Sequence, residues 1–313
     1  MRDTKKNEAT HRVPAWDPAR SDCELGHAAE LTENPYRRAI RGAFLAGSLA
    51  SLMLAGNVPA DELVWHSGFE TGFPGSEWLD FDNGSYSANG DLPHGRVSAW
   101  TIVDRQSGEP GFAGNHAYKG WVSGTAGSSH RAYPVLHSGT PTPLVNTFFV
   151  YLDADYERMS VLDWIHLGTW GNHDPAIGSG RWALHTMAVR DRKLEFAHTA
   201  PFHGNYIGPA APADFPLHRW VRLTVYMVYQ ETSGFVQAWQ DGVPMLRATV
   251  PGLKENPGTR LRTAHWGTYA SGGVARAVQY NDEIRICTLN APLTDLVSEP
   301  QCPSAAEGQP ANR

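Results

Sequence analysis

Short runs in which apolar and polar residues alternate recur from residue 61 onward, and clusters of Gly, Pro, Asn and Asp separate them. The apolar positions return every second residue and rarely every 3.6 residues, which predicts β-strands instead of helices. In the stretch "QDGVP", Asp241-Gly242 predicts the centre of a hairpin turn. The clearest runs cover residues 146–154, 161–170, 181–190, 193–199, 220–229, 234–242, 261–270 and 278–287. Residues 116–124 and 129–136 are expected to add two more strands.

Antiparallel strands at this spacing predict an all-β fold, a jelly-roll sandwich of two sheets. No internal repeat and no linker interrupts residues 61–303, so we expect a single domain there. The polar residues 304–313 are expected to form a loose tail.

The segment that precedes the strands has a different pattern. Residues 35–60 begin with basic residues from Arg37, continue through an apolar run over 43–55, and end in small residues at Ala60. This is the pattern of a secretory signal peptide, with cleavage expected after Ala60. The apolar run is shorter than the roughly 20 residues that span a membrane. We expect a disordered extension over residues 1–34 and a secreted or periplasmic protein that leaves the membrane after cleavage.

Charge and cysteine content narrow the partners and the compartment. A net charge of -6 and a pI near 6.1 argue against nucleic acid, which requires a basic face. An acidic polysaccharide stays open, because Arg and His can cluster locally on an acidic protein. Two of the three cysteines, Cys287 and Cys302, follow the signal segment. In an exported domain such a pair predicts a disulfide.

Alternation predicts which side chains share a face of each strand. Several strands place a histidine beside aromatic, small or hydroxyl side chains. One such histidine alone is best explained as a half-buried structural residue. Several of them on one face, together with aromatic residues, indicate a sugar-binding face. Aromatic rings stack on pyranoses, and polar groups fix the hydroxyls. The shared sets are Trp164, His166, Gly168 and Trp170; Thr263, His265, Gly267 and Tyr269; Leu194, Phe196 and His198; and Arg181, Ala183, His185 and Met187. The expected substrate-binding residues are Trp164, Trp170, His185, His198 and Trp266.

Residues 220–246 and 265–287 together resemble the C-terminal half of the jelly-roll polysaccharide lyases. This group includes heparin-lyase-I-like, glucuronan-lyase-like and alginate-lyase-like enzymes on a concanavalin A-like sandwich, and the resemblance extends over about residues 120–287. In that family a strand reading roughly K-x-G-x-Y carries the tyrosine of β-elimination. Here "HWGTY" ends in Tyr269, with His265 in place of Lys.

Two further positions match the family pattern. Arg131 in "SSHRAYPVL" matches an arginine on an upstream strand of these enzymes. His166 in "DWIHLGTW" matches the histidine of a Gln-x-His motif, with Trp164 where Gln is usual.

The resemblance implies β-elimination on a polysaccharide that contains uronic acid. A cation neutralises the uronate, a base removes the neighbouring carbon proton, and an acid protonates the departing oxygen. Arg131 matches the neutralising group, with His265 assisting it, while His166 and Tyr269 share the proton transfers. This chemistry requires no metal or organic cofactor, and the implied partner is an acidic polysaccharide bound by a monomer.

Three alternatives stay open at the level of sequence. A secreted lectin-like or laminin-G-like module has the same sandwich and binds sugars without catalysis. A glycoside hydrolase needs paired carboxylates, and "DADYE" places Asp153, Asp155 and Glu157 on one strand face. The acid- and Asn-rich stretches 80–91 and 280–282 offer oxygen ligands for a structural Ca²⁺, but their spacing matches no established calcium-binding loop, and turn chemistry is the better explanation.

Overall fold

The computed structural model describes residues 62–71, 78–80, 98–125, 129–171, 184–200, 203–207, 213–229, 233–251 and 260–303. Within these ranges the chain forms sixteen β-strands and two short 3-10 helices, η3 (Arg105–Ser107) and η4 (Tyr156–Arg158), with no α-helix. None of the described elements is a helix long and apolar enough to cross a membrane. The expected extension, signal segment and tail (1–34, 35–60 and 304–313) lie outside the described residues.

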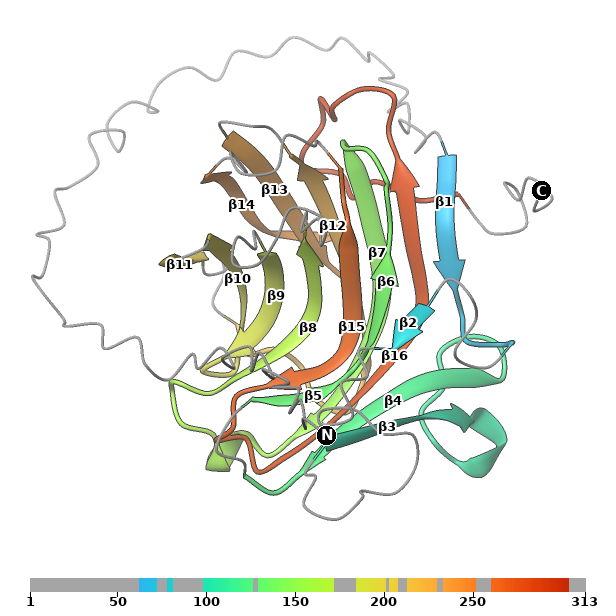
Figure 1. Ribbon diagram of the computed structural model, residues 1–313, viewed down its shortest axis with the longest axis vertical. Coiled ribbons are helices and arrows are strands. Elements are labelled where there is room, and N and C mark those ends of the chain that lie inside the picture. Colours follow the sequence, from blue (N-terminus) through green and yellow to red (C-terminus); the bar gives the residue numbers. More distant parts are fainter. Residues whose placement is uncertain are drawn as a thin grey trace, which may run out of the picture. The chain divides into compact units, whose positions relative to one another are not determined.

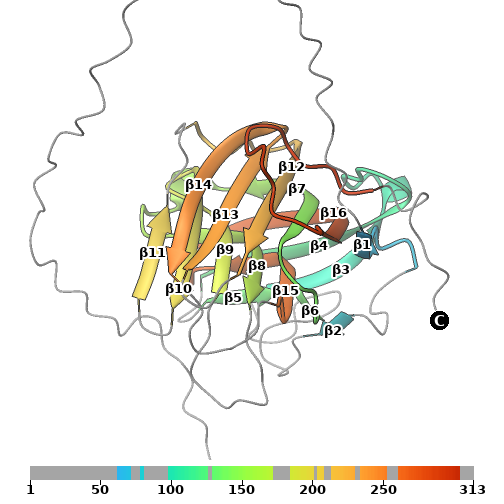
Figure 2. The same ribbon diagram turned by 90° about the horizontal axis from the view of Figure 1, so that it is seen from above.

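The strands form two antiparallel sheets, as predicted (Figures 1 and 2). Sheet A has the order β14 (Val243–Pro251), β13 (Ser233–Gln240), β12 (Trp220–Val228), β7 (Leu144–Ala154), β16 (Arg276–Thr288), β4 (His116–Ser123) and β3 (Ser98–Asp104), and β1 (Glu62–Ser67) also pairs with β16. Sheet B has the order β11 (His203–Ile207), β10 (Lys193–Ala200), β9 (Leu184–Arg190), β8 (Trp164–Gly171), β15 (Thr263–Ala270), β6 (Pro134–His137) and β2 (Trp78–Asp80), and β5 (His130–Ala132) also pairs with β15.

The sequence pattern located most of these strands but not all. Each predicted run contains a strand, and the run 129–136 contains two, β5 and β6. The turn at Asp241-Gly242 is confirmed, and both residues have positive φ, 51° and 87°, as a two-residue hairpin requires. Five strands lie outside the predicted runs: β1, β2, β3, β11 and β14.

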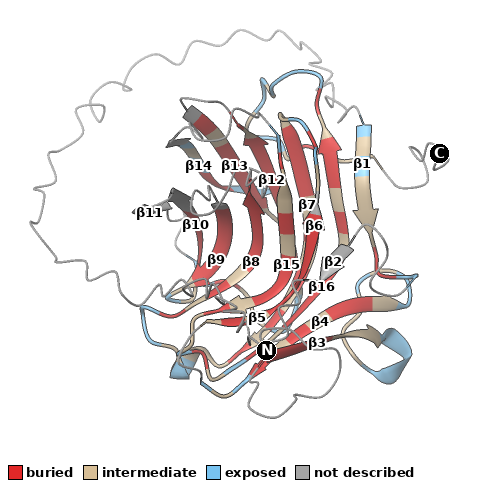
Figure 3. Cartoon of the chain, in the orientation of Figure 1, coloured by how far each residue is buried: buried red, intermediate tan, exposed pale blue. Residues whose placement is uncertain are grey.

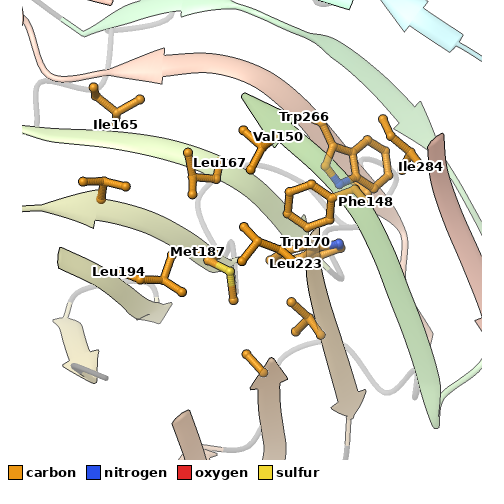
Figure 4. Packing of buried hydrophobic residues seen from close by; sticks show 14 of the residues in the cluster. Phe148, Val150, Ile165, Leu167, Trp170, Met187, Leu194, Leu223, Trp266 and Ile284 are labelled. Atoms are coloured by element: carbon orange, nitrogen blue, oxygen red, sulfur yellow. The ribbon is translucent and has the colours of Figure 1, made fainter. Parts of the chain in front are cut away.

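Alternation along each strand divides the side chains between the core and the outer faces. In β7, Phe148, Val150 and Leu152 are fully buried between the sheets, while Phe149 and Tyr151 lie on the outer face of sheet A. The buried positions follow the central strands of both sheets (Figures 3 and 4). Each buried side chain of this size stabilises the fold by about 1.5–3 kcal/mol.

Asn146 of β7 is a fully buried polar residue that links the two sheets. Its Oδ1 accepts hydrogen bonds from Nε1 of Trp170 in β8, at 2.9 Å, and from Nε1 of Trp266 in β15, at 3.2 Å. Its Nδ2 donates to the carbonyl of Arg285 at 2.7 Å. Because a buried polar group needs partners, this residue fixes β8 and β15 relative to sheet A.

The C-terminal strap (residues 289–303) crosses the outer face of sheet A. The predicted disulfide between Cys287 and Cys302 ties the strap to β16. Trp239 Nε1 donates to the carbonyl of Val297 at 3.0 Å, and the hydroxyl of Tyr226 accepts from the backbone of Leu293 at 3.1 Å. These residues form a second apolar cluster, outside the main core. The strap thus covers the outer face of β12 and β13.

Candidate active site

Three of the expected catalytic residues lie in one row across neighbouring strands of sheet B. Tyr269 of β15 pairs in register with Arg131 of β5 on one side and with His166 of β8 on the other. The row lies on the face that points away from sheet A, because Ala264, Trp266 and Ala270 of β15 are the residues that pack into the core. The structure therefore brings together residues that are more than a hundred positions apart in sequence.

The rings of this row contact one another. The ring centroid of Tyr269 lies 4.7 Å from that of His166, 4.9 Å from that of Trp164 and 6.0 Å from that of His265. The guanidinium carbon of Arg131 lies 5.4 Å from the centre of the same tyrosine ring. Tyr269 is thus the centre of a compact group of five partly buried side chains, all expected from the sequence.

A β-bulge places Tyr269 opposite His166. The register of β15 against β8 shifts between Trp266 and Tyr269, so that Tyr269, instead of Thr268, faces the histidine. Gly267 lies in the bulge with φ at 117°, and a Cβ there would approach the carbonyl oxygen of Ala132 to 2.8 Å. Only glycine fits such a backbone position, which accounts for the glycine within "HWGTY".

The small residues after Tyr269 make room for a hydrogen-bonded carboxylate. The hydroxyl of Ser271 donates to Asp163 at 2.6 Å, and a Cβ on Gly273 would approach the same carboxylate to 2.3 Å. Asp163 also accepts from the backbone of Ser160 at 2.8 Å. The end of β15 is thereby tied to the turn that leads into β8.

Tyr133 belongs to the group but was not expected from the sequence. Its ring stacks on that of His265 at 3.9 Å and lies 5.5 Å from that of Tyr269. It is the second residue after Arg131, so the alternation within "SHRAYPVL" already indicated a shared face. The residue lies between β5 and β6, where strand pairing is interrupted. Alternation is a weak guide at such a position, and for this reason the sequence did not identify Tyr133.

Both histidines of the group are held neutral. Burial, followed by the charges of His265 and Arg190, places the pKa of His166 well below its usual value. Burial and the neighbouring Arg131 lower the pKa of His265 to about 3. Near neutral pH the expected assistance of His265 would therefore come from a neutral ring, and Arg131 supplies the positive charge of the group.

A pair of buried threonines orients His166. The hydroxyl of Thr169 lies 3.4 Å from Nδ1 of His166 and 3.3 Å from the hydroxyl of Thr186. A hydroxyl can donate and accept at the same time, so this short chain can hold either tautomer of the ring. The contact leaves Nε2 as the nitrogen that faces away from the threonines.

Two tryptophans expected to bind substrate lie in the core instead (Figure 4). Trp170 is fully buried because the register of β8 against β9 shifts between His166 and Gly168, which reverses the alternation beyond that point. Trp266 is 1% exposed, on the opposite side of β15 from His265. Neither ring is available to stack on a sugar.

The remaining expected residues of β9 and β10 do not extend the site. His185 is 2% exposed, and its ring lies 5.7 Å from that of Phe196 and 5.1 Å from that of Tyr229. Its expected role in binding substrate is wrong, because the residues that share its face of β9 pack into the core. His198 pairs in register with His185, and its side chain lies outside the described residues.

The carboxylates of the hydrolase alternative do not share a strand face. Asp153 lies in β7, Asp155 follows the end of that strand, and Glu157 lies in η4. Asp153 also forms ion pairs with Arg276, at 2.9 Å, and with His218, at 3.0 Å, which lower the pKa of its carboxyl against the opposing effect of burial. These acids thus lack the arrangement that hydrolysis needs.

The expected calcium-binding stretches gain no support from the described residues. Residues 280–282 lie inside β16 and not in a loop. Asp282 is buried and accepts from the backbone amides of Ala113, at 3.1 Å, and Glu283, at 2.7 Å. Within the described ranges no cluster of three or more His, Cys, Asp or Glu side chains is arranged to hold a metal ion. Residues 81–91 lie outside those ranges.

Comparison with known proteins shows the fold. No family model and no curated protein matches the sequence. The chain is similar to the solved structure of the endo-β-1,4-glucuronan lyase from the fungus Trichoderma reesei, with 14% identity, coverage of 77% of this chain and 100% of that one, and a TM-score of 0.50. Alginate lyase Aly36B matches with 11% identity over 58% of this chain and 84% of its own, at a TM-score of 0.44. LamAcat from Zobellia galactanivorans matches with 11% identity over 73% and 98%, at 0.40. The predicted resemblance to jelly-roll lyases is confirmed for the fold.

Proposed function

We propose that this protein is a secreted polysaccharide lyase that cleaves a polymer containing uronic acid by β-elimination. The observation that carries the proposal is the cross-strand row of Arg131, Tyr269 and His166. The row combines one cation, one phenol and one neutral imidazole within ring-contact distance. The fold shared with the glucuronan lyase supports a polymeric substrate.

Arg131 neutralises the carboxylate of the uronate in this proposal. The proton next to a carboxylate is hard to remove, because the resulting carbanion lies beside a negative charge. A guanidinium binds a carboxylate through two parallel hydrogen bonds and so stabilises the charge that develops. Since both histidines are neutral, this task falls to Arg131 within the group.

His166 and Tyr269 carry the two proton transfers. A neutral imidazole accepts a proton directly, so His166 acts as the base through Nε2, while Thr169 holds Nδ1. The hydroxyl of Tyr269 then donates a proton to the departing glycosidic oxygen. The bond between that oxygen and C4 breaks as the C4–C5 double bond forms, and the balance requires no added oxidant or reductant.

Trp164 contacts the sugar ring in this scheme, and the buried Tyr133 positions His265. Trp164 contacts both His166, at 4.2 Å between ring centroids, and Tyr269. Tyr133 keeps His265 flat against its own ring, and the neutral His265 acts as a hydrogen-bond partner of the substrate.

The test incubates the secreted chain with glucuronan, alginate and a glycosaminoglycan, and follows the ultraviolet absorbance of the unsaturated product. A lyase produces this absorbance with at least one polymer, and Tyr269→Phe loses it. A sugar-binding module without catalysis would bind a polymer and produce no absorbance with any of them. Release of reducing ends without the absorbance would indicate hydrolysis. Either outcome overturns the proposal.

A further inference from the structure

The outer face of sheet A carries a second cross-strand row, on the opposite side of the sandwich from the candidate active site. Trp220 of β12 pairs in register with Tyr151 of β7, Tyr151 with Tyr280 of β16, and Tyr280 with Lys119 of β4. Neighbouring strands lie about 4.8 Å apart, so the row extends over about 14 Å.

The side chains of this row support one another. The ring of Tyr151 lies 5.8 Å from that of Trp220 and 5.6 Å from that of Tyr280, both in edge-on contacts. Nζ of Lys119 lies 5.4 Å from the centre of the Tyr280 ring and 5.9 Å from that of Trp121. Such contacts hold the rings in place before any ligand arrives, which lowers the entropic cost of binding.

A loop adds a further ring beside the row. Phe112 stacks on Phe149 of β7 with 3.6 Å between ring centroids and lies 5.9 Å from the ring of Trp220. Phe112 is 40% exposed, which is unusual for a phenylalanine and leaves one of its faces open. Trp121, Tyr151 and Trp220, together with Phe149, are only partly buried.

The charges beside the row balance one another. Lys119 forms an ion pair with Glu109 at 2.6 Å, and the hydroxyl of Tyr280 donates to the same carboxylate at 2.5 Å. At the other side, Asp153 pairs with Arg276 at 2.9 Å. A face whose charges are matched in this way favours an uncharged ligand over an anionic one.

The outer face of sheet A also carries aromatic residues that have a structural role, on the part of the face that the C-terminal strap covers. Tyr226 of β12 and Trp239 of β13 also point outward from sheet A, but the C-terminal strap covers both. Trp220, in the same strand as Tyr226, has no such cover from the strap and stays partly exposed. Among the described residues, the strap therefore covers the half of this face that carries Tyr226 and Trp239 and not the half that carries the row.

We propose that Trp220, Tyr151 and Lys119, supported from beside by the buried Tyr280 and extended by Phe112 and Trp121, form a second carbohydrate-binding surface for uncharged pyranose stretches of a polysaccharide. Partly exposed rings offer apolar contact to the C–H faces of sugars, while Lys119 and Glu109 offer hydrogen bonds to hydroxyls. The surface would hold the enzyme on a polymer while the opposite sheet acts.

The experiment is affinity electrophoresis of the secreted chain in native gels that contain hydroxyethylcellulose, galactomannan or lichenan, with alginate and polymer-free gels as references. We expect retardation in at least one of the uncharged gels. Trp220→Ala should weaken the apparent affinity by at least about tenfold, as loss of a central aromatic contact does elsewhere. Phe112→Ala, in an exposed loop, should weaken it in the same direction without a risk to folding, which thermal unfolding of both variants checks.

Trp164→Ala is the matched control, because it removes a ring from the outer face of sheet B. It should leave retardation in the uncharged gels unchanged, and equal weakening by Trp164→Ala and Trp220→Ala would overturn the proposal. Migration unchanged in all three uncharged gels would overturn it as well. A dimer in light scattering that Trp220→Ala abolishes would show that a second copy occupies the face instead. Because none of these readouts involves cleavage, they are independent of the proposed lyase activity.

Discussion

The two outer faces of this sandwich use the same construction for different purposes. Each carries a row of side chains that strand register aligns across neighbouring strands. Tyrosines on central strands occupy the middle of each row, Tyr269 on sheet B and Tyr151 with Tyr280 on sheet A. On sheet A the lysine at the end of the row is matched by Glu109. On sheet B the row combines an arginine with a histidine held neutral. If both proposals hold, alignment of side chains across strands is enough for a binding surface, whereas catalysis also requires groups whose protonation is set by burial and neighbouring charge.

The largest expected effect is a difference in turnover between variants of Tyr269, in the row on sheet B, and of Tyr280, in the row on sheet A. Tyr269→Phe should lower turnover of the cleaved polymer by about 10²–10⁴, the usual cost of losing an acid–base group. Tyr280→Phe, which loses a hydroxyl from the row on sheet A, should leave turnover unchanged. Rates of product absorbance measure both variants. Equal turnover in the parent and in Tyr269→Phe would reduce that tyrosine to a packing role.

The next largest expected effect is a loss of stability when the glycine in the bulge of β15 is replaced. Gly267→Ala forces a side chain into a left-handed backbone position and against the carbonyl of Ala132, so the free energy of unfolding should fall by about 2–4 kcal/mol. Gly242→Ala is the matched control in a hairpin of sheet A. Its φ is also positive, but the nearest atoms lie 3.6 Å from the added Cβ, so it should cost only about 1 kcal/mol. Denaturant unfolding measures both, and similar losses would contradict the account of the bulge.

Thr169→Val tests whether the threonine pair positions His166. Loss of one hydrogen bond costs about 0.5–1.5 kcal/mol, so we expect turnover to fall by up to about tenfold. The acidic limb of the pH–rate profile should shift as well, because Thr169 contacts Nδ1 of the base. Thr169→Ser should restore both readouts. A variant that loses stability but keeps the pH profile would show that Thr169 only packs.

The smallest effect concerns pH and stability. The pKa of His265 is about 3 in the folded protein and lies near 6.5 in an unfolded chain, so between these values the unfolded chain binds the extra proton. Stability should therefore fall as pH falls below 6.5. The full shift corresponds to about 2 kcal/mol at pH 5. Because the ring of His265 is partly exposed, solvent screening reduces this, and His265→Gln should lessen the loss by about 1 kcal/mol. Asp282, whose burial raises its pKa to about 6, acts with the opposite sign, but it is present in both proteins and cancels. Identical slopes for parent and variant would contradict a neutral buried histidine.

The sequence predicted the positions of the strands better than it predicted which side of each strand faces the core. Alternation within 261–270 placed His265 and Tyr269 on one side, and the structure has them there. The same reasoning failed for Trp170, because a bulge in β8 reverses the alternation and no residue pattern marks it. It failed for His185 because the periodicity of a strand does not tell which face is buried. A polar residue on a core-facing strand looks the same as one on a binding face.

Residues outside regular pairing were the hardest to predict. Tyr133 lies between two short strands, so its contact with His265 depends on how β5 and β6 both pair with β15. The row on sheet A depends on the register among β12, β7, β16 and β4, which the four segments do not encode individually. Long-range register is set by the packing of the whole sandwich, and for this reason local patterns cannot supply it.

The order of strands in the sheets determines when this chain can fold. β15 and β16, the last two strands in sequence, are both central in their sheets, and β16 pairs with the first described strand, Glu62 opposite Thr288. Neither sheet can close before the final strands have left the ribosome, and folding depends on contacts between distant segments. Such topologies fold slowly. A polypeptide that stays open until its end is made remains in a form that can be threaded across a membrane, and any truncation before residue 263 removes the centre of both sheets at once.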